Sequence, residues 1–171
     1  MLKNTKISVL NSTIAICTLV FQLLMACNSL YAQDLLKERI RKISGKKTSV
    51  YIENGIFHNG GVKSEGTIKG LRQSYNPKQG FERIVIDLAQ TEIPKVYGNI
   101  NSLDQKVYID FFDTNLDKEL KTISATKFVE KVNFYPIEKN HVSVELKLKS
   151  KASADIFFLS NPGRLVIDLK N

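Results

Sequence analysis

The sequence has no tryptophan and only two cysteines among its 171 residues. Cys17 and Cys27 both precede residue 33, so the chain beyond that point has neither a disulfide framework nor a thiol for catalysis. An apolar core must therefore hold the fold, and nine Phe and six Tyr supply its aromatic part. Hydrophobic residues make up 43% and charged residues 25%, which predicts one packed globular domain.

The residue patterns of common enzymes are also missing. The two histidines, His58 and His141, stand in no pattern with the spacing of metal ligands, and no glycine-rich phosphate motif or serine nucleophile elbow occurs. Asp110 and Asp113 could form a glycosidase pair, but a turn-capping role is far commoner for aspartates at a strand end. We therefore expect no enzymatic activity, no cofactor and no metal, and keep a small hydrolase or ligand carrier as a minor alternative.

The N-terminus has the pattern of an export signal. Lys3 and Lys6 precede an apolar stretch over residues 14–25, which is too short to span a bilayer as a helix. We expect residues 1–32 to be a signal peptide, removed after the small residue Ala32.

A second cleavage site remains open. Leu24-Met25-Ala26-Cys27 resembles a bacterial lipobox, in which Cys27 would be acylated. The protein would then be attached to the membrane by lipid, and only in that case do we expect a membrane partner.

The formal net charge is +8, and it falls to +6 once Lys3 and Lys6 leave with the signal peptide. Positive charge often indicates nucleic-acid binding, but an exported protein rarely meets nucleic acid, and we expect no such partner. Anionic polymers of the cell envelope are the alternative partners. Solvated lysines without a partner explain the charge equally well.

Residues 33–65 are expected to form a linker with local structure. Residues 34–43 have apolar positions at helical spacing, and Asp34 is a possible N-cap, which predicts a short helix. Glycine, serine and lysine dominate the rest, with one possible hairpin at residues 59–61.

The residue pattern changes near residue 66, and residues 66–171 predict an all-β domain. Short runs of β-branched and aromatic residues alternate with turn residues, and a single helical turn is conceivable at residues 116–123. The predicted strands begin near Ile68 and continue at residues 83–88, 96–100, 107–112, 129–135, 142–148, 154–159 and 165–169. This pattern is typical of a β-sandwich or barrel.

The strands repeat as a unit of four. Residues 84–88 (IVIDL) overlay residues 142–146 (VSVEL) at a spacing of 58, and residues 106–111 (KVYIDF) overlay residues 164–169 (RLVIDL) in the same register. Two copies are too few for a solenoid. They predict a small sandwich of two antiparallel sheets with pseudo-twofold symmetry, in which each copy provides much of one sheet.

In these strands, side chains alternate between the core and the outer face of the sheet. Arg83 and Asp87 on one strand, and Arg164 and Asp168 on another, point away from the core. Residues four apart on one strand cannot pair with each other, so each charge needs a cross-strand partner, which would fix the register. Alternatively, these four residues and Asn161 bind a ligand on a shared outer face together with exposed tyrosines.

The lines FERIVIDL (81–88) and NPGRLVIDL (161–169) resemble the AMIN domain over about residues 66–170. That family consists of small pseudosymmetric all-β modules of exported bacterial envelope proteins, found with peptidoglycan amidases and with secretins. The resemblance implies a periplasmic location, binding to the cell wall or to envelope machinery, and no catalysis by the module itself.

In many relatives such a domain directs a catalytic or secretin domain that follows it in the chain. This sequence ends at Asn171, two residues after the last predicted strand. We therefore expect a stand-alone binding module or a partner for another protein. The favoured hypothesis is a non-catalytic module that contacts peptidoglycan or a wall-associated complex. The alternative is a structural protein of a pilus or secretin assembly that binds a protein partner through a sheet edge.

Overall fold

The computed structural model describes residues 40–45, 48–61 and 65–171. The expected signal peptide, its cleavage site and Cys27 lie outside these residues. Across the described ranges every regular element is a strand, and none of their segments is a helix able to cross a membrane. The strands are β1 Ile40–Lys42, β2 Asn54–His58, β3 Gly66–Asn76, β4 Phe81–Leu88, β5 Val96–Asn101, β6 Lys106–Phe112, β7 Thr114–Leu116, β8 Val129–Glu138, β9 His141–Leu148, β10 Ser153–Leu159 and β11 Arg164–Lys170.

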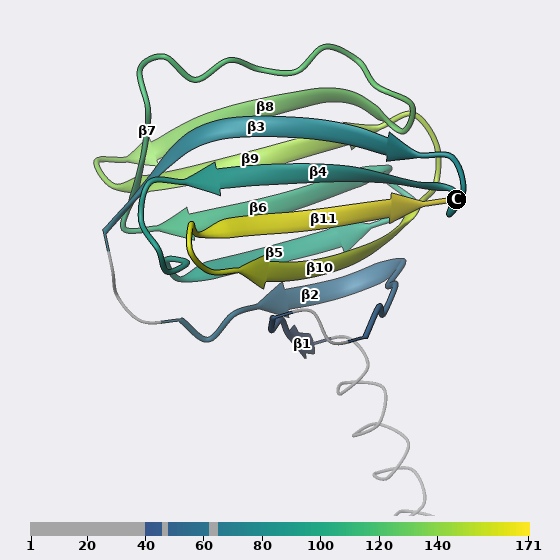
Figure 1. The fold of residues 1–171 in the computed structure, drawn as a ribbon, viewed down its shortest axis with the longest axis horizontal. Coiled ribbons are helices and arrows are strands. Elements are labelled where there is room, and N and C mark those ends of the chain that lie inside the picture. The colour runs from purple at the N-terminus through teal and green to yellow at the C-terminus, as the bar shows by residue number, and fades with distance from the viewer. Residues whose placement is uncertain (1–39, 46–47, 62–64) are drawn as a thin grey trace, which may run out of the picture. The chain divides into compact units, whose positions relative to one another are not determined.

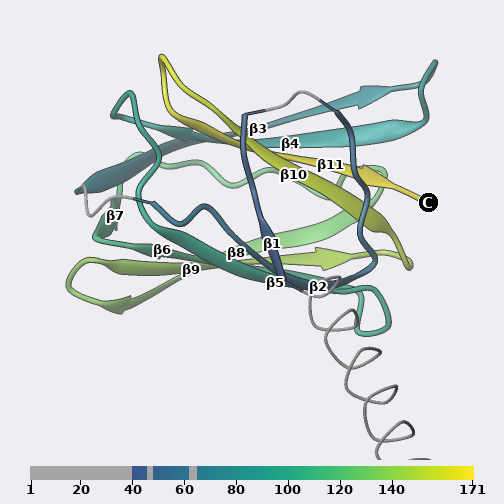
Figure 2. The ribbon, with the colours of Figure 1, turned by 90° about the horizontal axis from the view of Figure 1, so that it is seen from below.

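The strands form two sheets that pack face to face, which confirms the predicted all-β sandwich (Figures 1 and 2). One sheet has six strands in the order β1-β2-β5-β6-β9-β8, and the other has five in the order β10-β11-β4-β3-β7. Both sheets are mixed rather than purely antiparallel, because β1 runs parallel to β2 and β7 runs parallel to β3. Figure 2 shows the two layers edge-on.

Alternation along each strand builds the core, as the sequence pattern predicts. Phe81–Leu88 has the burial pattern of a strand with one face turned inward, and its letters Ile84, Ile86 and Leu88 are buried. The repeated motif at Lys106–Phe112 behaves in the same way, with Val107, Ile109 and Phe111 fully buried. Such side chains from both sheets meet between the layers and form one hydrophobic cluster.

The four-strand unit is visible in the topology, but its distribution differs from the prediction. β3-β4-β5-β6 form the first copy and β8-β9-β10-β11 the second. Each copy splits, so that one sheet contains β5-β6-β9-β8 and the other contains β10-β11-β4-β3. The expectation that each copy provides much of one sheet is therefore wrong: each copy gives two strands to each sheet, and the last strand of each copy pairs with the second strand of the other.

The described part of the expected linker belongs to the sandwich. Ile40–Lys42 is a strand, so the helix expected over residues 34–43 does not include these residues; residues 34–39 lie outside the described ranges. Phe57 of β2 is fully buried and lies directly over Gly98, where a Cβ would come within 2.2 Å of its ring. A five-residue strand was missed here because glycine and asparagine neighbours are poor strand formers.

Residues between β1 and β2 also contact the second sheet. Ile52 exchanges two backbone hydrogen bonds with Ala154 of β10, at 2.9 and 2.8 Å, and the Phe158 N–H donates to the Ser44 carbonyl at 3.2 Å. This segment pairs with the outer edge of β10 and satisfies backbone groups that would otherwise be free.

The opposite side of the sandwich is spanned by residues 117–128, which connect β7 to β8 and have no helical turn (Figure 1). Glu82, fully buried on β4, holds the end of this loop: its carboxylate accepts hydrogen bonds from the Phe128 N–H at 2.6 Å, the Lys127 N–H at 3.3 Å and Gln73 Nε2 at 2.6 Å. A buried carboxylate needs such donors, and here they fix the loop to the sheet.

Candidate functional site

Four of the five residues that the sequence nominates lie together on the outer face of the five-stranded sheet. Asp168 is opposite Arg83 and Arg164 is opposite Asp87 in the β11–β4 register. Arg83 Nε and Nη2 donate to the two carboxylate oxygens of Asp168 at 2.6 and 2.8 Å. Asp168 is fully buried, and this bidentate bond raises the pKa of the Arg83 guanidinium.

Aromatic rings enclose this ion pair. The Arg83 guanidinium carbon lies 5.2 Å from the ring centre of Phe81 and 5.6 Å from that of Phe157. Tyr51 is close by: burial, then the charges of Asp168 and Asp155, raise the pKa of its phenol against the opposing effect of Arg83. The pair is thus part of a closed, packed surface.

Asp87 and Arg164 do not pair with each other. Arg72 of β3 forms a bidentate bond with Asp87, with both distances 2.6 Å, and the Arg164 Nε donates to the Pro162 carbonyl at 3.3 Å. Arg72 is 61% exposed, so this second ion pair lies at the surface. The prediction that each charge needs a cross-strand partner is confirmed for Asp87 and Asp168.

Asn161 lies apart from these charges, in the turn between β10 and β11. Its side chain is exposed, its φ is +56°, and its N–H donates to the Thr91 carbonyl at 3.3 Å. The neighbouring Gly163 packs on the backbone of residues 90–92, where a Cβ would come within 2.8 Å of the Gln90 carbonyl oxygen. The Asn-Pro-Gly motif therefore fits a close contact between two turns.

The outer face of the six-stranded sheet has a different character. Strand registers align its outward residues in rows across the strands, and we call this surface the tyrosine face. The first row is His58, Tyr97, Asp110, Ser143 and Tyr135, and the second is Ile56, Asn99, Tyr108, Glu145 and Asn133. Tyr97 is 42%, Tyr108 37% and Tyr135 47% exposed. Three exposed aromatic side chains on one surface make this face a candidate for binding.

A hydrogen-bonded cluster fixes the centre of the tyrosine face. Lys106 Nζ donates to the Tyr108 hydroxyl at 2.9 Å and to Glu145 at 3.2 Å, and Asn133 Nδ2 donates to Glu145 at 3.0 Å. Burial acts to raise the pKa of Glu145, but bonds from Asn133, Tyr108 and Lys106 outweigh it and lower that pKa. Bonds to Tyr108 and Glu145 raise the pKa of Lys106. Both groups are charged at neutral pH.

A third row, which includes Lys106 of this cluster, contains three lysines. Lys106 is opposite Lys147 across β6 and β9, and Lys147 is opposite Lys131 on β8. Lys147 pairs with Glu130 at 3.0 Å, at positions that are half exposed. The row places positive charge along one border of the tyrosine face.

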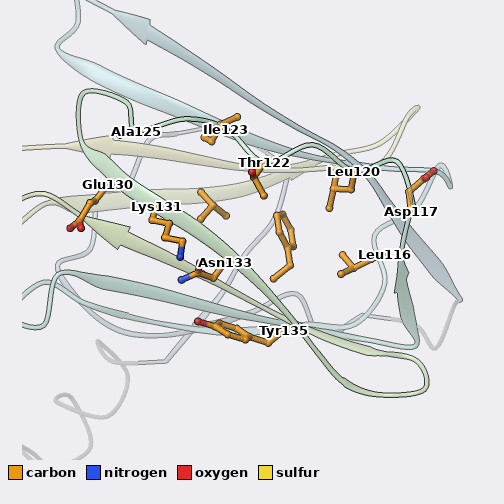
Figure 3. Close-up of a pocket in the computed structure, with 12 residues that line it drawn as sticks. Leu116, Asp117, Leu120, Thr122, Ile123, Ala125, Glu130, Lys131, Asn133 and Tyr135 are labelled. Atoms are coloured by element: carbon orange, nitrogen blue, oxygen red, sulfur yellow. The ribbon is translucent and has the colours of Figure 1, made fainter.

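A groove of about 570 Å³ lies between β8 and the loop 117–128 (Figure 3). Leu116, Leu120 and Ile123 line it from one side, and residues 130–135 of β8 line it from the other. β8 is the outermost strand of its sheet, and Tyr135 and Ile137 on it are exposed. The groove therefore borders a sheet edge.

From the sequence we expected exposed tyrosines to bind together with the four nominated charges on one outer face, but the structure places the exposed tyrosines on the outer face of the other sheet. The signal was available in the outward positions of three strands, where tyrosine occurs at residues 97, 108 and 135. No cluster of three or more His, Cys, Asp or Glu side chains that could hold a metal occurs within residues 40–45, 48–61 and 65–171.

Comparison with known proteins finds a family model that matches part of the chain. The AMIN domain model matches residues 131–171, which span β8 to β11, the second copy of the four-strand unit. The resemblance seen in the sequence is thereby confirmed for this copy. The AMIN family is a family of exported envelope modules associated with amidases and secretins. Curated proteins and solved structures yield no match to the chain.

Proposed function

We propose that this protein is a non-catalytic periplasmic module that binds peptidoglycan through the tyrosine face. The family match to residues 131–171 supports an envelope role. The observation that carries the choice of surface is the contrast in exposure: three tyrosines are exposed on one outer face, whereas the nominated charges of the other face, Arg83, Asp87 and Asp168, are engaged in ion pairs.

The charge of the protein fits an anionic polymer. The lysine row of Lys106, Lys147 and Lys131 borders the exposed tyrosines. Lys106 pairs with Glu145 and Lys147 with Glu130, so the exposed Lys131 is the lysine best placed to meet the carboxylates of the peptidoglycan stem peptides. Arg83, Asp87 and Asp168 serve in this proposal to fix strand register, and Arg164 and Asn161 to shape the turn that begins β11.

Sedimentation with purified sacculi tests the proposal. The chain from residue 33 is expected to move to the pellet, and more weakly as salt is raised. Asn99→Glu, which places a negative charge in the middle of the tyrosine face, should weaken binding about fivefold, or about 1 kcal/mol. Asn115→Glu is the matched control, because Asn115 is exposed on the other sheet.

A wild-type protein that stays in the supernatant at low salt would contradict peptidoglycan binding. Equal losses in both variants would contradict the assignment to the tyrosine face, since they would show only a general effect of charge.

A second function rests on the edge of the six-stranded sheet. β8 is ten residues long, lies at the end of its sheet and borders the groove, which suits an extended segment of a partner in a pilus or secretin assembly. Pro136 within β8 limits such pairing, because proline lacks an N–H to donate. Ile137→Lys should abolish capture of a partner by this edge and leave sacculus sedimentation unchanged.

A further inference from the structure

The three tyrosines of the tyrosine face have a regular placement. Tyr97 is opposite Asp110 and Asn99 is opposite Tyr108, so Tyr97 and Tyr108 are diagonal neighbours on adjacent strands, about 7–8 Å apart. Tyr135 lies in the row of Tyr97, three strands away, which is about 14 Å at ordinary strand spacing. Three flat rings are thus distributed across the strands rather than along one of them.

Tyr108 is held in place before any ligand binds. Its hydroxyl accepts a hydrogen bond from Lys106 Nζ, which also lies 5.5 Å from the centre of the ring. Glu145, only 9% exposed, bonds to the same Lys106. A side chain that is already ordered loses little conformational entropy on binding, which favours affinity.

Polar side chains occupy the spaces between the rings. Asn99, Asp110 and Ser143 point outward from β5, β6 and β9, and offer hydrogen-bond donors and acceptors. Pyranose rings match this combination, because their C–H faces pack on aromatic rings while their hydroxyls and amides bond at the edges.

We propose that the tyrosine face binds the sugar chain of an anionic glycan, with Tyr97 and Tyr108 as adjacent stacking platforms and Tyr135 as a third. Lys131, exposed in the lysine row, gives the charge complementarity that selects this occupant, because carboxylates attached to the sugar chain would lie beside it, whereas Lys147 already pairs with Glu130. This inference rests on the proposed function and adds that the sugar, not the stem peptide, is the main contact.

Binding of a soluble oligomer of β-1,4-linked N-acetylglucosamine tests it, with a free stem peptide as the alternative probe. The protein has no tryptophan, so tryptophan emission does not mask changes in tyrosine fluorescence, and calorimetry measures the affinity independently. We expect the oligomer to bind and the peptide to bind at least about tenfold more weakly. Tyr97→Ala and Tyr108→Ala should each weaken oligomer binding about tenfold, or about 1.4 kcal/mol.

Two further variants separate stacking from folding. Tyr108→Phe keeps the ring and loses the Lys106 bond, so it should retain more affinity than Tyr108→Ala. Leu103→Ala is the control, because Leu103 is a large exposed side chain in the turn between β5 and β6 and should leave oligomer binding unchanged. Thermal unfolding of each variant verifies that the fold persists.

The outcomes distinguish this inference from the proposed function. Sacculus binding without oligomer binding, and unaffected by both tyrosine substitutions, would overturn the inference and leave peptidoglycan binding in place. Oligomer binding without sacculus binding would support the sugar platforms and overturn the proposed function. Failure of both ligands would overturn both.

Discussion

Two strands with nearly the same sequence have opposite surroundings in this protein. Lys106–Phe111 (KVYIDF) and Arg164–Leu169 (RLVIDL) occupy equivalent places in the two copies of the fold, and each pairs with the second strand of the other copy. Their inward letters are buried alike. Their outward letters differ: Tyr108 is 37% exposed where Val166 is 1% exposed.

The aspartates show the same divergence. Asp168 is fully buried and bonded to Arg83, whereas Asp110 at the equivalent position is half-buried. The same residue at equivalent positions of the two copies therefore need not have the same role, because its role depends on what packs over the outer face of its sheet. Inward residues of both copies are constrained by one shared core. Outward residues are free to diverge, and they form a packed surface on one sheet and an exposed surface on the other.

Asp168→Asn should have the largest effect on stability. It removes the negative partner of a partly buried arginine, and breaking such a pair costs about 3 kcal/mol of unfolding free energy. The equivalent Asp110→Asn should cost within about 0.5 kcal/mol, as for ordinary surface substitutions. Urea denaturation of both variants measures the difference, and equal losses would show that the two faces are not distinct.

Exchanging the equivalent outward residues Val166 and Tyr108 tests, through side-chain packing, whether one face is closed and the other open. Val166→Tyr introduces a large ring at a position that is 1% exposed, and overpacking there should cost about 2 kcal/mol. Tyr108→Val, the reverse exchange, should cost under about 1 kcal/mol, because the ring it removes is partly exposed. A stable Val166→Tyr protein would indicate that the outer face of β11 is open.

Glu145→Gln should cost about 1 kcal/mol near neutral pH, because it weakens the charge-assisted bonds from Lys106 and Asn133. The pKa of Glu145 is lowered in the folded state, so its stabilisation is present above its ordinary value of about 4.3 and is lost as the pH falls through the folded value. The gap between wild type and Glu145→Gln should therefore close below about pH 4. A gap that is constant with pH would exclude this ionisation as its cause.

The sequence predicted the sandwich, the four-strand unit and most strands from alternation and turn residues, because these depend on local chemistry. The sequence did not predict that each copy divides between the two sheets, because alternation identifies the buried face of a strand without showing which sheet the strand belongs to. β2 was missed for a related reason: Phe57 is buried by long-range pairing with Gly98, which no local pattern records.

The candidate site was harder to predict than the fold. Arg83 and Asp168 drew attention because alternation places their side chains outward, but these outward positions serve pairing across β4 and β11. Tyr97 and Tyr108 do not recur between the copies: Tyr108 corresponds to Val166, and the strand containing Tyr97 has no tyrosine in its counterpart. Binding surfaces on duplicated folds are better sought where the copies differ.

Arg72→Ala should cause the smallest loss of unfolding free energy among these variants, because it removes an exposed ion pair. Its bidentate bond with Asp87 is as short as that of Arg83 with Asp168, but Arg72 is 61% exposed and water screens the pair. The loss should be about 0.5 kcal/mol and should shrink further in 1 M salt. Denaturation at low and high salt measures both values. If Arg72→Ala cost as much as Asp168→Asn, bond geometry rather than burial would determine the strength of ion pairs on this sheet.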